Sequence, residues 1–404
     1  MRRRAVLAGL PLGVLGLAAC GPEQDGADAS PSVPPVEQIE PVQVGERAEV
    51  VAYTELRLPL EMTPMVVVDP GWIAVPRQLD GIFLGYREEG THLRFLAVDQ
   101  DGTVLWRADR PLGCTGFVLT RGAEDAPVAV LADLAEAAAE EPPATTLTGY
   151  DLRTAELLWG PIEAPGPQAA PGLVHAAAAA EPEGEGGPRT ALSGATGEPL
   201  LREEDLAGGR ILGEHLGTVV HLAGDELRAS GADGEELWSI PLPAGIEPAR
   251  AQLLGTIDPT TSFAVVAGED SRGAVVDLAD GRVIARDASA VARDHVLETT
   301  VVVSGTTVRG LEDDGTEKWT HEDSEPLQLL CAGERLAYAV RPEEGTLVVL
   351  DTNRGIMVQP YDVDQEGPLA VPQLFSADTA AAVRVEERYL LVTTEFDEEY
   401  GQRG

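Results

Sequence analysis

The sequence feature that most constrains the fold is a hairpin that recurs along the chain. Its clearest copy, Leu227–Trp238, reads L-R-A-S-G-A-D-G-E-E-L-W, with a polar turn ending at Gly234 and a Trp four residues later. Glycine supplies the positive φ that such a turn requires, and the bulky Trp covers a neighbouring sheet. One hairpin cannot bury its apolar faces alone, so further copies are expected.

Six more copies are present. The turn residues fall at positions 102, 155, 197, 234, 281, 315 and 355, spaced by 53, 42, 37, 47, 34 and 40 residues. Four of the five Trp residues occupy the slot after the turn. This is the period of a four-stranded propeller blade with loop insertions. We interpret the following as structural positions of the repeat: Gly102, Trp106, Trp159, Gly197, Gly234, Trp238, Gly281, Gly315, Trp319 and Gly355.

The repeat resembles a known family. The stretch A-L-S-G-A-T-G-E-P-L-L at 191–201, with Y-D-L-R-T-A-E-L-L-W at 150–159 and G-A-V-V-D-L-A-D-G-R-V-I-A at 273–285, is similar to the pyrrolo-quinoline quinone (PQQ)-like β-propeller repeat. The resemblance covers about residues 42–396. It implies a fold rather than a function, because quinoprotein dehydrogenases, bacterial outer-membrane-assembly lipoproteins and other extracytoplasmic binding proteins share the repeat.

We therefore predict an all-β, eight-bladed β-propeller of four-stranded antiparallel blades over residues 42–404. Three strands at the C-terminal end, the last at Arg388–Phe396, lack a fourth partner. The unpaired N-terminal strand Ala48–Leu58 is expected to complete that blade and close the ring. Met65–Asp69 is assigned to the first blade. A seven-bladed ring with loose ends is the alternative.

Two further segments are assigned a secondary structure. Asp133–Glu140 is an Ala- and Glu-rich run that favours a short helix inside a loop of the second blade. Ile356–Tyr361 is predicted to be the fourth strand of the seventh blade.

The N-terminus has the pattern of an export signal. Arg2–Arg4 precede a 15-residue apolar run, Ala5–Ala19, which is too short to span a membrane as a helix. The sequence L-A-A-C-G around Cys20 resembles a bacterial lipobox, which implies a signal peptide over 1–19 and a lipidated Cys20 whose thiol carries diacylglycerol, with palmitate among the acyl chains of the lipid. An ordinary leader is the alternative, and both the general secretory and the twin-arginine routes stay open. Residues 20–41 are predicted to be a flexible tether.

The charge restricts the partners. The formal net charge is −39, and loss of the three leader arginines lowers it to −42. Such a surface repels nucleic-acid phosphates and anionic lipid headgroups, so we expect neither as a partner. Membrane attachment is expected through the lipid on Cys20 alone, with the domain on the extracytoplasmic side of the cell membrane.

Three sets of residues resemble parts of a metal, calcium or disulfide site. His215 and His221 lie on successive strands of one blade without a visible third ligand. Asp362–Gly367 imitates the first half of a calcium loop, but position twelve is Gln373 instead of a bidentate Glu. Cys114 and Cys331 fall in distant repeats and are expected to be separate buried thiols.

These patterns predict a binding protein rather than an enzyme. The adjacent cysteine pair often present in the resembled quinone enzymes is missing, and none of their site residues can be carried over. We expect no catalytic residues, no cofactor and no metal, and a scaffold that binds another envelope protein or ligand. The alternative is a quinone- and calcium-dependent dehydrogenase, or a small-ligand sensor, with a degenerate site.

Overall fold

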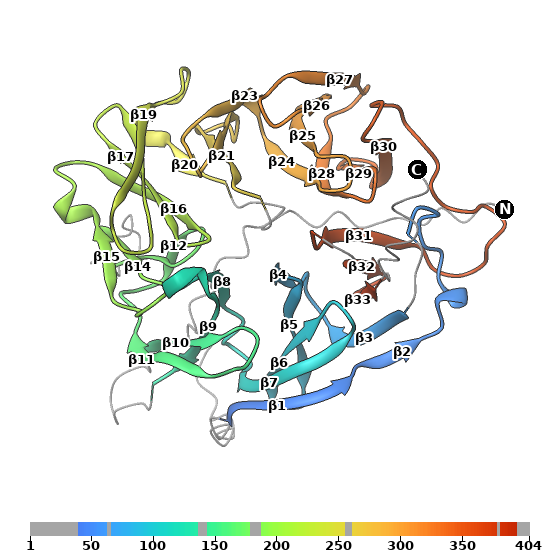
Figure 1. Ribbon diagram of the computed structural model, residues 1–404, viewed down its shortest axis with the longest axis horizontal. Helices are drawn as coiled ribbons and strands as arrows, with labels where there is room; N and C mark the ends of the chain where they lie inside the picture. Colours follow the sequence, from blue (N-terminus) through green and yellow to red (C-terminus); the bar gives the residue numbers. More distant parts are fainter. Residues whose placement is uncertain are drawn as a thin grey trace, which may run out of the picture.

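The computed structural model describes residues 39–62, 66–135, 144–177, 187–254, 261–377 and 380–393. These residues form eight antiparallel sheets that stand as blades around a common axis (Figure 1). The predicted all-β, eight-bladed propeller is confirmed, and the seven-bladed alternative is wrong. Helix within the described ranges is limited to four 3-10 turns: η1 (Tyr53–Glu55), η2 (Ala123–Asp125), η3 (Glu203–Asp205) and η4 (Pro248–Arg250).

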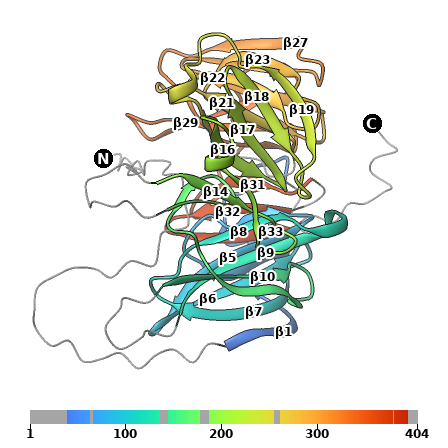
Figure 2. The ribbon, with the colours of Figure 1, turned by 90° about the vertical axis from the view of Figure 1, so that its left-hand side faces the viewer.

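Blades 2 to 6 have four strands each, ordered from the axis outwards; Figure 2 shows blade 4 from the side. Blade 2 contains β8 (Phe117–Arg121), β9 (Pro127–Leu134), β10 (Thr145–Asp151) and β11 (Leu157–Glu163). Blade 3 contains β12 (Gln168–Ala170), β13 (Val174–Ala176), β14 (Arg189–Leu192) and β15 (Pro199–Arg202). Blade 4 contains β16 (Arg210–His215), β17 (Thr218–Ala223), β18 (Glu226–Ser230) and β19 (Glu236–Pro241). Blade 5 contains β20 (Gln252–Leu253), β21 (Phe263–Ala267), β22 (Gly273–Asp277) and β23 (Val283–Ala288), and blade 6 contains β24 (Ala290–Asp294), β25 (Thr299–Ser304), β26 (Thr307–Leu311) and β27 (Glu317–Glu322).

The remaining three blades depart from four strands. Blade 1 has β4 (Arg77–Leu79), β5 (Ile82–Glu89), β6 (His92–Asp99) and β7 (Thr103–Pro111), with β1 (Ile39–Arg47) added outside β7. Blade 7 has β28 (Gln328–Gly333), β29 (Leu336–Arg341) and β30 (Thr346–Asp351). Blade 8 joins both chain ends: β31 (Ala370–Phe375), β32 (Ala380–Val385), β33 (Arg388–Thr393), β3 (Val66–Trp72) and the outermost β2 (Glu49–Val51).

The strand that closes the ring is β3, so the assignment of that role to 48–58 was wrong. β3 pairs with β33 from Val66 opposite Thr393 onwards, so the described part of the predicted strand Met65–Asp69, Val66–Asp69, belongs to blade 8 instead of blade 1. Val67 and Val68 are buried in two different wedges, one on each side of blade 8. A continuous apolar run suits such a strand, whereas the alternation of residues 48–58 suits an outer edge.

Blade 7 lacks its predicted fourth strand. Ile356–Tyr361 contacts β30 through one isolated bridge, Leu350 to Met357, and Tyr361 pairs instead with Pro59. Pro360 has no N–H to donate to a ladder, which limits the run as a strand. The outer edge of blade 7 is therefore only partly covered.

Two predicted boundaries also change. β9 continues to Leu134, opposite Thr145 of β10, so the predicted helix is wrong at its start, and its residues 136–140 lie outside the described residues. β1 begins at Ile39, inside the predicted tether. The leader and Cys20 also lie outside the described part of the chain.

The core is divided into eight apolar clusters, one in each wedge between neighbouring blades. Between blades 1 and 2, for example, Phe95 and Trp106 pack with Leu131. Because blades stack face to face, their inner strands are buried on both sides. The smallest cluster, between blades 3 and 4, contains Val174, Ala191, Ile211 and Val219.

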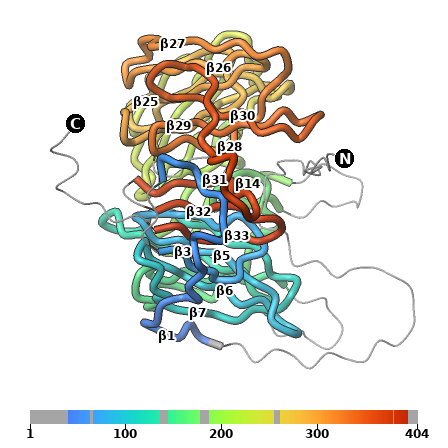
Figure 3. Tube along the Cα trace, turned by 90° about the vertical axis from the view of Figure 1, so that its right-hand side faces the viewer, coloured from blue at the N-terminus to red at the C-terminus, as the bar shows by residue number. Residues whose placement is uncertain are grey.

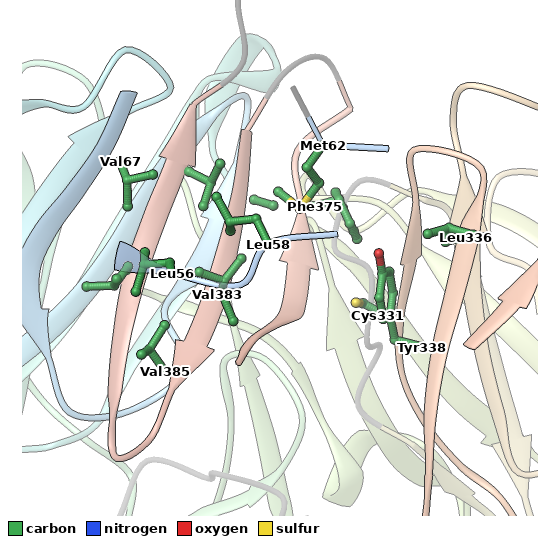
Figure 4. Packing of buried hydrophobic residues seen from close by; sticks show 14 of the residues in the cluster. Leu56, Leu58, Met62, Val67, Cys331, Leu336, Tyr338, Phe375, Val383 and Val385 are labelled. Carbon is green, nitrogen blue, oxygen red and sulfur yellow. The ribbon is translucent and has the colours of Figure 1, made fainter. Parts of the chain in front are cut away.

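Residues 39–62 form an N-terminal strap around the outside of the ring. The strap adds β1 to blade 1 and β2 to blade 8, and then reaches the wedge between blades 8 and 7 (Figure 3). There Leu56, Leu58 and Met62 are buried beside Val383 and Phe375 (Figure 4). The strap thus contacts three successive blades in the direction opposite to the rest of the chain.

Candidate binding sites

The four repeat tryptophans join each blade to the next. Each indole N–H donates to a backbone carbonyl that lies three residues before the turn residue of the following blade. The pairs are Trp106 with Leu152 at 2.7 Å, Trp159 with Gly194 at 2.8 Å, Trp238 with Leu278 at 2.7 Å and Trp319 with Thr352 at 2.6 Å. All four indoles are buried. These side chains are therefore occupied by contacts within the ring.

The turn glycines complete these contacts. The six glycines have φ from +67° to +87°, and Ala155 takes φ +59° in the same slot. A Cβ on Gly197, Gly281 or Gly355 would approach the Trp ring of the preceding blade to 2.5, 2.8 and 2.3 Å respectively. Gly102 and Gly315 also lack room for a Cβ, whereas the nearest atom at Gly234 would be 3.6 Å away. Most of these glycines thus allow both the turn and the neighbouring blade's approach.

Near the axis, Glu214 of β16 ties three blades together. Its carboxylate accepts hydrogen bonds from Thr120 Oγ1 of β8 at 2.7 Å, the Leu173 N–H at 3.0 Å and the Gly217 N–H at 2.6 Å. Glu214 is 4% exposed, and Cβ on Gly172 would lie 2.2 Å from its Oε2. A buried carboxylate needs such donors. Glu214 therefore supports the wedge with the smallest apolar cluster.

Arg77 of β4 brings blade 1 into this axial group. Burial lowers the pKa of Arg77 to about 10, and the charge of Glu214 opposes that shift. The Arg77 guanidinium also lies 5.0 Å from the ring centroid of Phe117. Sequence reasoning missed this group. A Glu directly after the apolar stretch Ile211–Gly213 is a signal that could have marked position 214.

A cavity of about 180 Å³ lies where blade 1 meets blade 8, under the strap. We call it the seam cavity. Its walls come from Arg87, Arg94 and Arg107 of blade 1 and Asp69 of blade 8, and Glu46 of the strap also lines it. Sites for cofactor-sized ligands usually begin at about 300 Å³. The seam cavity is therefore suited at most to water or a small group.

Two of the three arginines of the seam cavity, Arg87 and Arg94, are held by carboxylates of the same blade. Arg87 lies directly opposite Arg94, an unfavourable pairing of like charges. Glu89 lies 3.2 Å from Arg87 Nη2 and 2.6 Å from Arg94 Nη1, and Asp109 accepts two hydrogen bonds from Arg94. The hydrogen bond to Asp109 raises the pKa of Arg94. This network stiffens the closing seam and occupies the two guanidinium groups.

Trp72, the fifth tryptophan, lies in the same closing wedge. It is fully buried against Gly85 of β5, where a Cβ would come within 2.7 Å of the indole. Its Nε1 has no hydrogen-bond partner within the described ranges. The closing wedge therefore lacks the indole–carbonyl link found at the four repeat tryptophans.

The residues considered as metal ligands are not brought together. His215 pairs with Thr218 and His221 with Ile211, so the two imidazoles are not opposite each other. Residues 362–367 form a turn against the strap, in which Gln365 Nε2 donates to the Leu56 carbonyl at 2.7 Å. Across the described ranges no group of three or more His, Cys, Asp or Glu side chains could hold a metal ion.

The two remaining cysteines are separate. Cys114 and Cys331 are buried thiols that form no disulfide with each other, as predicted. Over the same described ranges, no helix combines the length and apolar character needed to cross a membrane.

Fold and repeat together define an eight-bladed propeller built from PQQ-like repeats, joined by tryptophan–carbonyl contacts. A family model described as outer membrane protein assembly factor BamB matches residues 190–395, just over half of the chain. The chain belongs to this family.

Solved structures with a similar fold have low sequence identity. BamB from Moraxella catarrhalis is 12% identical, covers 83% of this chain and 100% of its own, and has a TM-score of 0.46. Apo AztD from Citrobacter koseri is 11% identical, covers 72% of this chain and 73% of its own, and has a TM-score of 0.35. A chain of a nidogen/laminin complex is 12% identical, covers 71% of this chain and 93% of its own, and has a TM-score of 0.30. No curated protein matches the chain.

Proposed function

We propose that this protein is a lipid-anchored, extracytoplasmic scaffold whose propeller binds another protein of the cell envelope. Membership of the family described as outer membrane protein assembly factor BamB carries this proposal. The lipobox-like sequence at Cys20 supports anchoring, and the 18 residues from 21 to 38 offer a tether between anchor and ring. The partner is proposed to be recognised by the surface of the propeller.

We further propose that the protein is not an enzyme. The sequence lacks the paired cysteines of the resembled quinone enzymes, and its repeat tryptophans and glycines are used in blade contacts. Titration of the purified protein with PQQ and Ca²⁺ tests this. No spectral change is expected. A saturable spectral change, accompanied by alcohol-dependent reduction of a dye, would contradict the proposal.

Anchoring is tested by Cys20→Ser with metabolic labelling by an alkyne-bearing palmitate analogue. The parent protein is expected to be labelled and to sediment with membranes. The Cys20→Ser protein is expected to lose both properties, whereas the control Cys114→Ser should retain them because Cys114 is buried in the ring. Labelling of the Cys20→Ser protein would contradict lipidation at this residue.

Binding is tested by affinity capture of the full, lipidated chain from detergent-solubilised membranes of its own host. One envelope protein is expected at a stoichiometric ratio, and purified partner and chain should reassociate in solution. Capture that returns no protein, or only partners that fail to reassociate, would contradict the scaffold function.

A further inference from the structure

Exposed apolar side chains gather on one part of the rim. Thirteen large apolar residues are exposed within the described ranges, and six of these lie in residues 50–60 of the strap or 356–363 after β30. These two segments contain only 19 of the described residues. We call the six residues the rim patch: Val50, Tyr53, Leu60, Ile356, Met357 and Val363. Such a concentration of exposed apolar side chains marks interaction sites on soluble proteins.

The two segments of the rim patch meet at residues 59–60 and 360–361. Pro59 pairs with Tyr361, and the Leu60 N–H donates to the Pro360 carbonyl at 2.7 Å. Further along, Arg57 pairs with Leu369. Leu60 is 64% exposed and Val363 is 75% exposed, although the neighbouring Leu58 is buried. The strap therefore buries one set of apolar side chains and presents another outward.

The rim patch also borders an incompletely paired sheet edge. Met357 forms the single bridge to Leu350 of β30, and the Val358 N–H donates to the Val349 carbonyl at 2.9 Å. Leu347, two residues earlier on β30, has no ladder partner on the outer side among the described residues. An open edge beside apolar side chains suits an extended segment of another chain.

The negative charge around the rim patch restricts which partners can bind there. Six exposed carboxylates stand on these segments and their immediate neighbours, residues 49–61 and 354–366: Glu49, Glu55, Glu61, Asp362, Asp364 and Glu366. Within the described ranges none of the six takes part in an ion pair, and the basic residues of these segments are Arg57 and Arg354. A second copy would bring two acidic surfaces together in a symmetric contact, and an anionic bilayer would be repelled. A basic partner is complementary.

We infer that the rim patch and the open edge of β30 bind an extended protein segment that carries both apolar and basic side chains. This inference rests on the proposed scaffold function and assigns it to the outer rim of blades 7 and 8. Apolar side chains of the segment contact Leu60, Met357 and Val363, and its Lys or Arg side chains contact the surrounding carboxylates. The two contributions make different predictions for substitutions and for salt.

The test uses the full chain and three eight-residue peptides of alternating residues: Leu-Lys, Leu-Glu and Ser-Lys. Fluorescence anisotropy gives Kd for each. The Leu-Lys peptide is expected to bind at least tenfold more tightly than the other two. A triple variant, Leu60→Ser, Met357→Ser and Val363→Ser, should weaken Leu-Lys binding at least tenfold. The variant Asp362→Asn with Asp364→Asn should weaken it several-fold and flatten its salt dependence.

The matched control is Leu237→Ser, because Leu237 is also a rim leucine and is 50% exposed on blade 4. It should leave Kd unchanged, and circular dichroism should show that every variant is folded. Equal loss in the control, or equal affinity for the Leu-Glu peptide, would overturn the inference. The inference would also be overturned if the parent protein formed a dimer, or bound anionic vesicles, and the triple variant abolished that association.

The partner captured from membranes separates this inference from the proposed function. The triple variant should lose that partner, and Leu237→Ser should keep it. If the triple variant still binds the partner stoichiometrically, the scaffold function stands and the rim patch is not its site. If neither protein captures a partner, the scaffold function itself fails.

Discussion

Trp319 of blade 6 lies directly against Gly355 of blade 7, where an added Cβ would come within 2.3 Å of the indole ring. The same indole donates its N–H to the Thr352 carbonyl, three residues before Gly355. One turn therefore provides both the space and the acceptor for the neighbouring blade. Each repeat therefore needs a glycine to receive the tryptophan of the preceding blade and a tryptophan to contact the following blade. This is why the two residues recur together in the sequence.

We expect Gly355→Ala to destabilise the ring more than Gly234→Ala. Both residues have positive φ, +67° and +84°, so both substitutions introduce a left-handed Ala at about 1–2 kcal/mol. At Gly355 the methyl also collides with Trp319, which adds about 1–3 kcal/mol for overpacking. At Gly234 the nearest atom is 3.6 Å away. Urea unfolding measures the difference, and equal losses would contradict the role given to Gly355.

Trp319→Phe should lower the free energy of unfolding more than Trp72→Phe. Both substitutions reduce the volume of a buried aromatic side chain. Only Trp319→Phe removes an indole hydrogen bond within the described ranges. It leaves the buried Thr352 carbonyl without its donor, which should lower the free energy of unfolding by about 1–3 kcal/mol. The comparison needs urea denaturation of the two variants at one pH. A larger loss for Trp72→Phe would show that the indole–carbonyl link contributes little.

Glu214→Ala is expected to be among the most damaging single changes, at about 3–5 kcal/mol, because it strands buried donors of blades 2, 3 and 4. Glu214→Gln should cost less but remain destabilising, since its amide group would face a donor. Glu317, exposed on β27, is the control, and its Ala variant should stay within about 0.5 kcal/mol of the parent. Thermal and urea unfolding test both. An Ala variant at position 214 that is as stable as the control would refute the axial role.

Asp323 should make stability depend on acid pH. Two hydrogen bonds from Arg341, at 2.9 and 2.8 Å, lower the pKa of Asp323 well below its usual value. Its contribution is therefore complete above the unfolded pKa of about 3.9, and it is lost as pH falls through the lower folded pKa. Asp323→Asn should cost about 1.5–3 kcal/mol at pH 7. The difference from the parent should shrink below about pH 4.

The partner variant checks the cause of this acid dependence. Arg341→Gln should remove a similar part of the pH dependence, and the double variant should be less damaged than the sum of the two single variants. Urea unfolding at a series of pH values gives these quantities. A difference between parent and Asp323→Asn that stays constant down to pH 2 would contradict the assignment.

The strap should contribute to stability through its second half. Leu56→Ala and Leu58→Ala remove side chains that are 2% and 7% exposed, and each should cost about 2–5 kcal/mol. Val50→Ala is the control, because Val50 is 61% exposed. Deletion of residues 39–51 is likewise expected to cost much less than deletion of 39–62. Differential scanning calorimetry ranks these proteins, and equal melting temperatures for the two deletions would contradict this order.

The repeat was predictable from sequence because its signal is local. Turn glycines and the tryptophans that follow them mark the outer hairpin of each blade within about twelve residues. The pairing of distant strands is not local. Residues 48–58 and β3 both have strand composition, and the choice of β3 depends on burial against blades that are distant in sequence.

The candidate sites were less predictable for the same reason. Glu214 receives donors from residues 94 and 41 positions away, so its environment exists only in the assembled ring. The rim patch depends on which leucines of the strap face inward: Leu58 is buried and Leu60 is exposed. Tyr361 was assigned to a blade-7 strand, but it pairs with Pro59 of the strap, and only the bridge at Met357 joins the segment to β30.

Pairing of β3 with β33 has a consequence for biogenesis. Val66 meets Thr393, so this sheet joins segments more than 300 residues apart and cannot assemble until translation has passed residue 393. Termination before β33 leaves β3 without its neighbour. The unpaired backbone N–H and C=O groups of β3 then make the chain prone to proteolysis and aggregation. Completion of the ring thus reports that synthesis has passed β33.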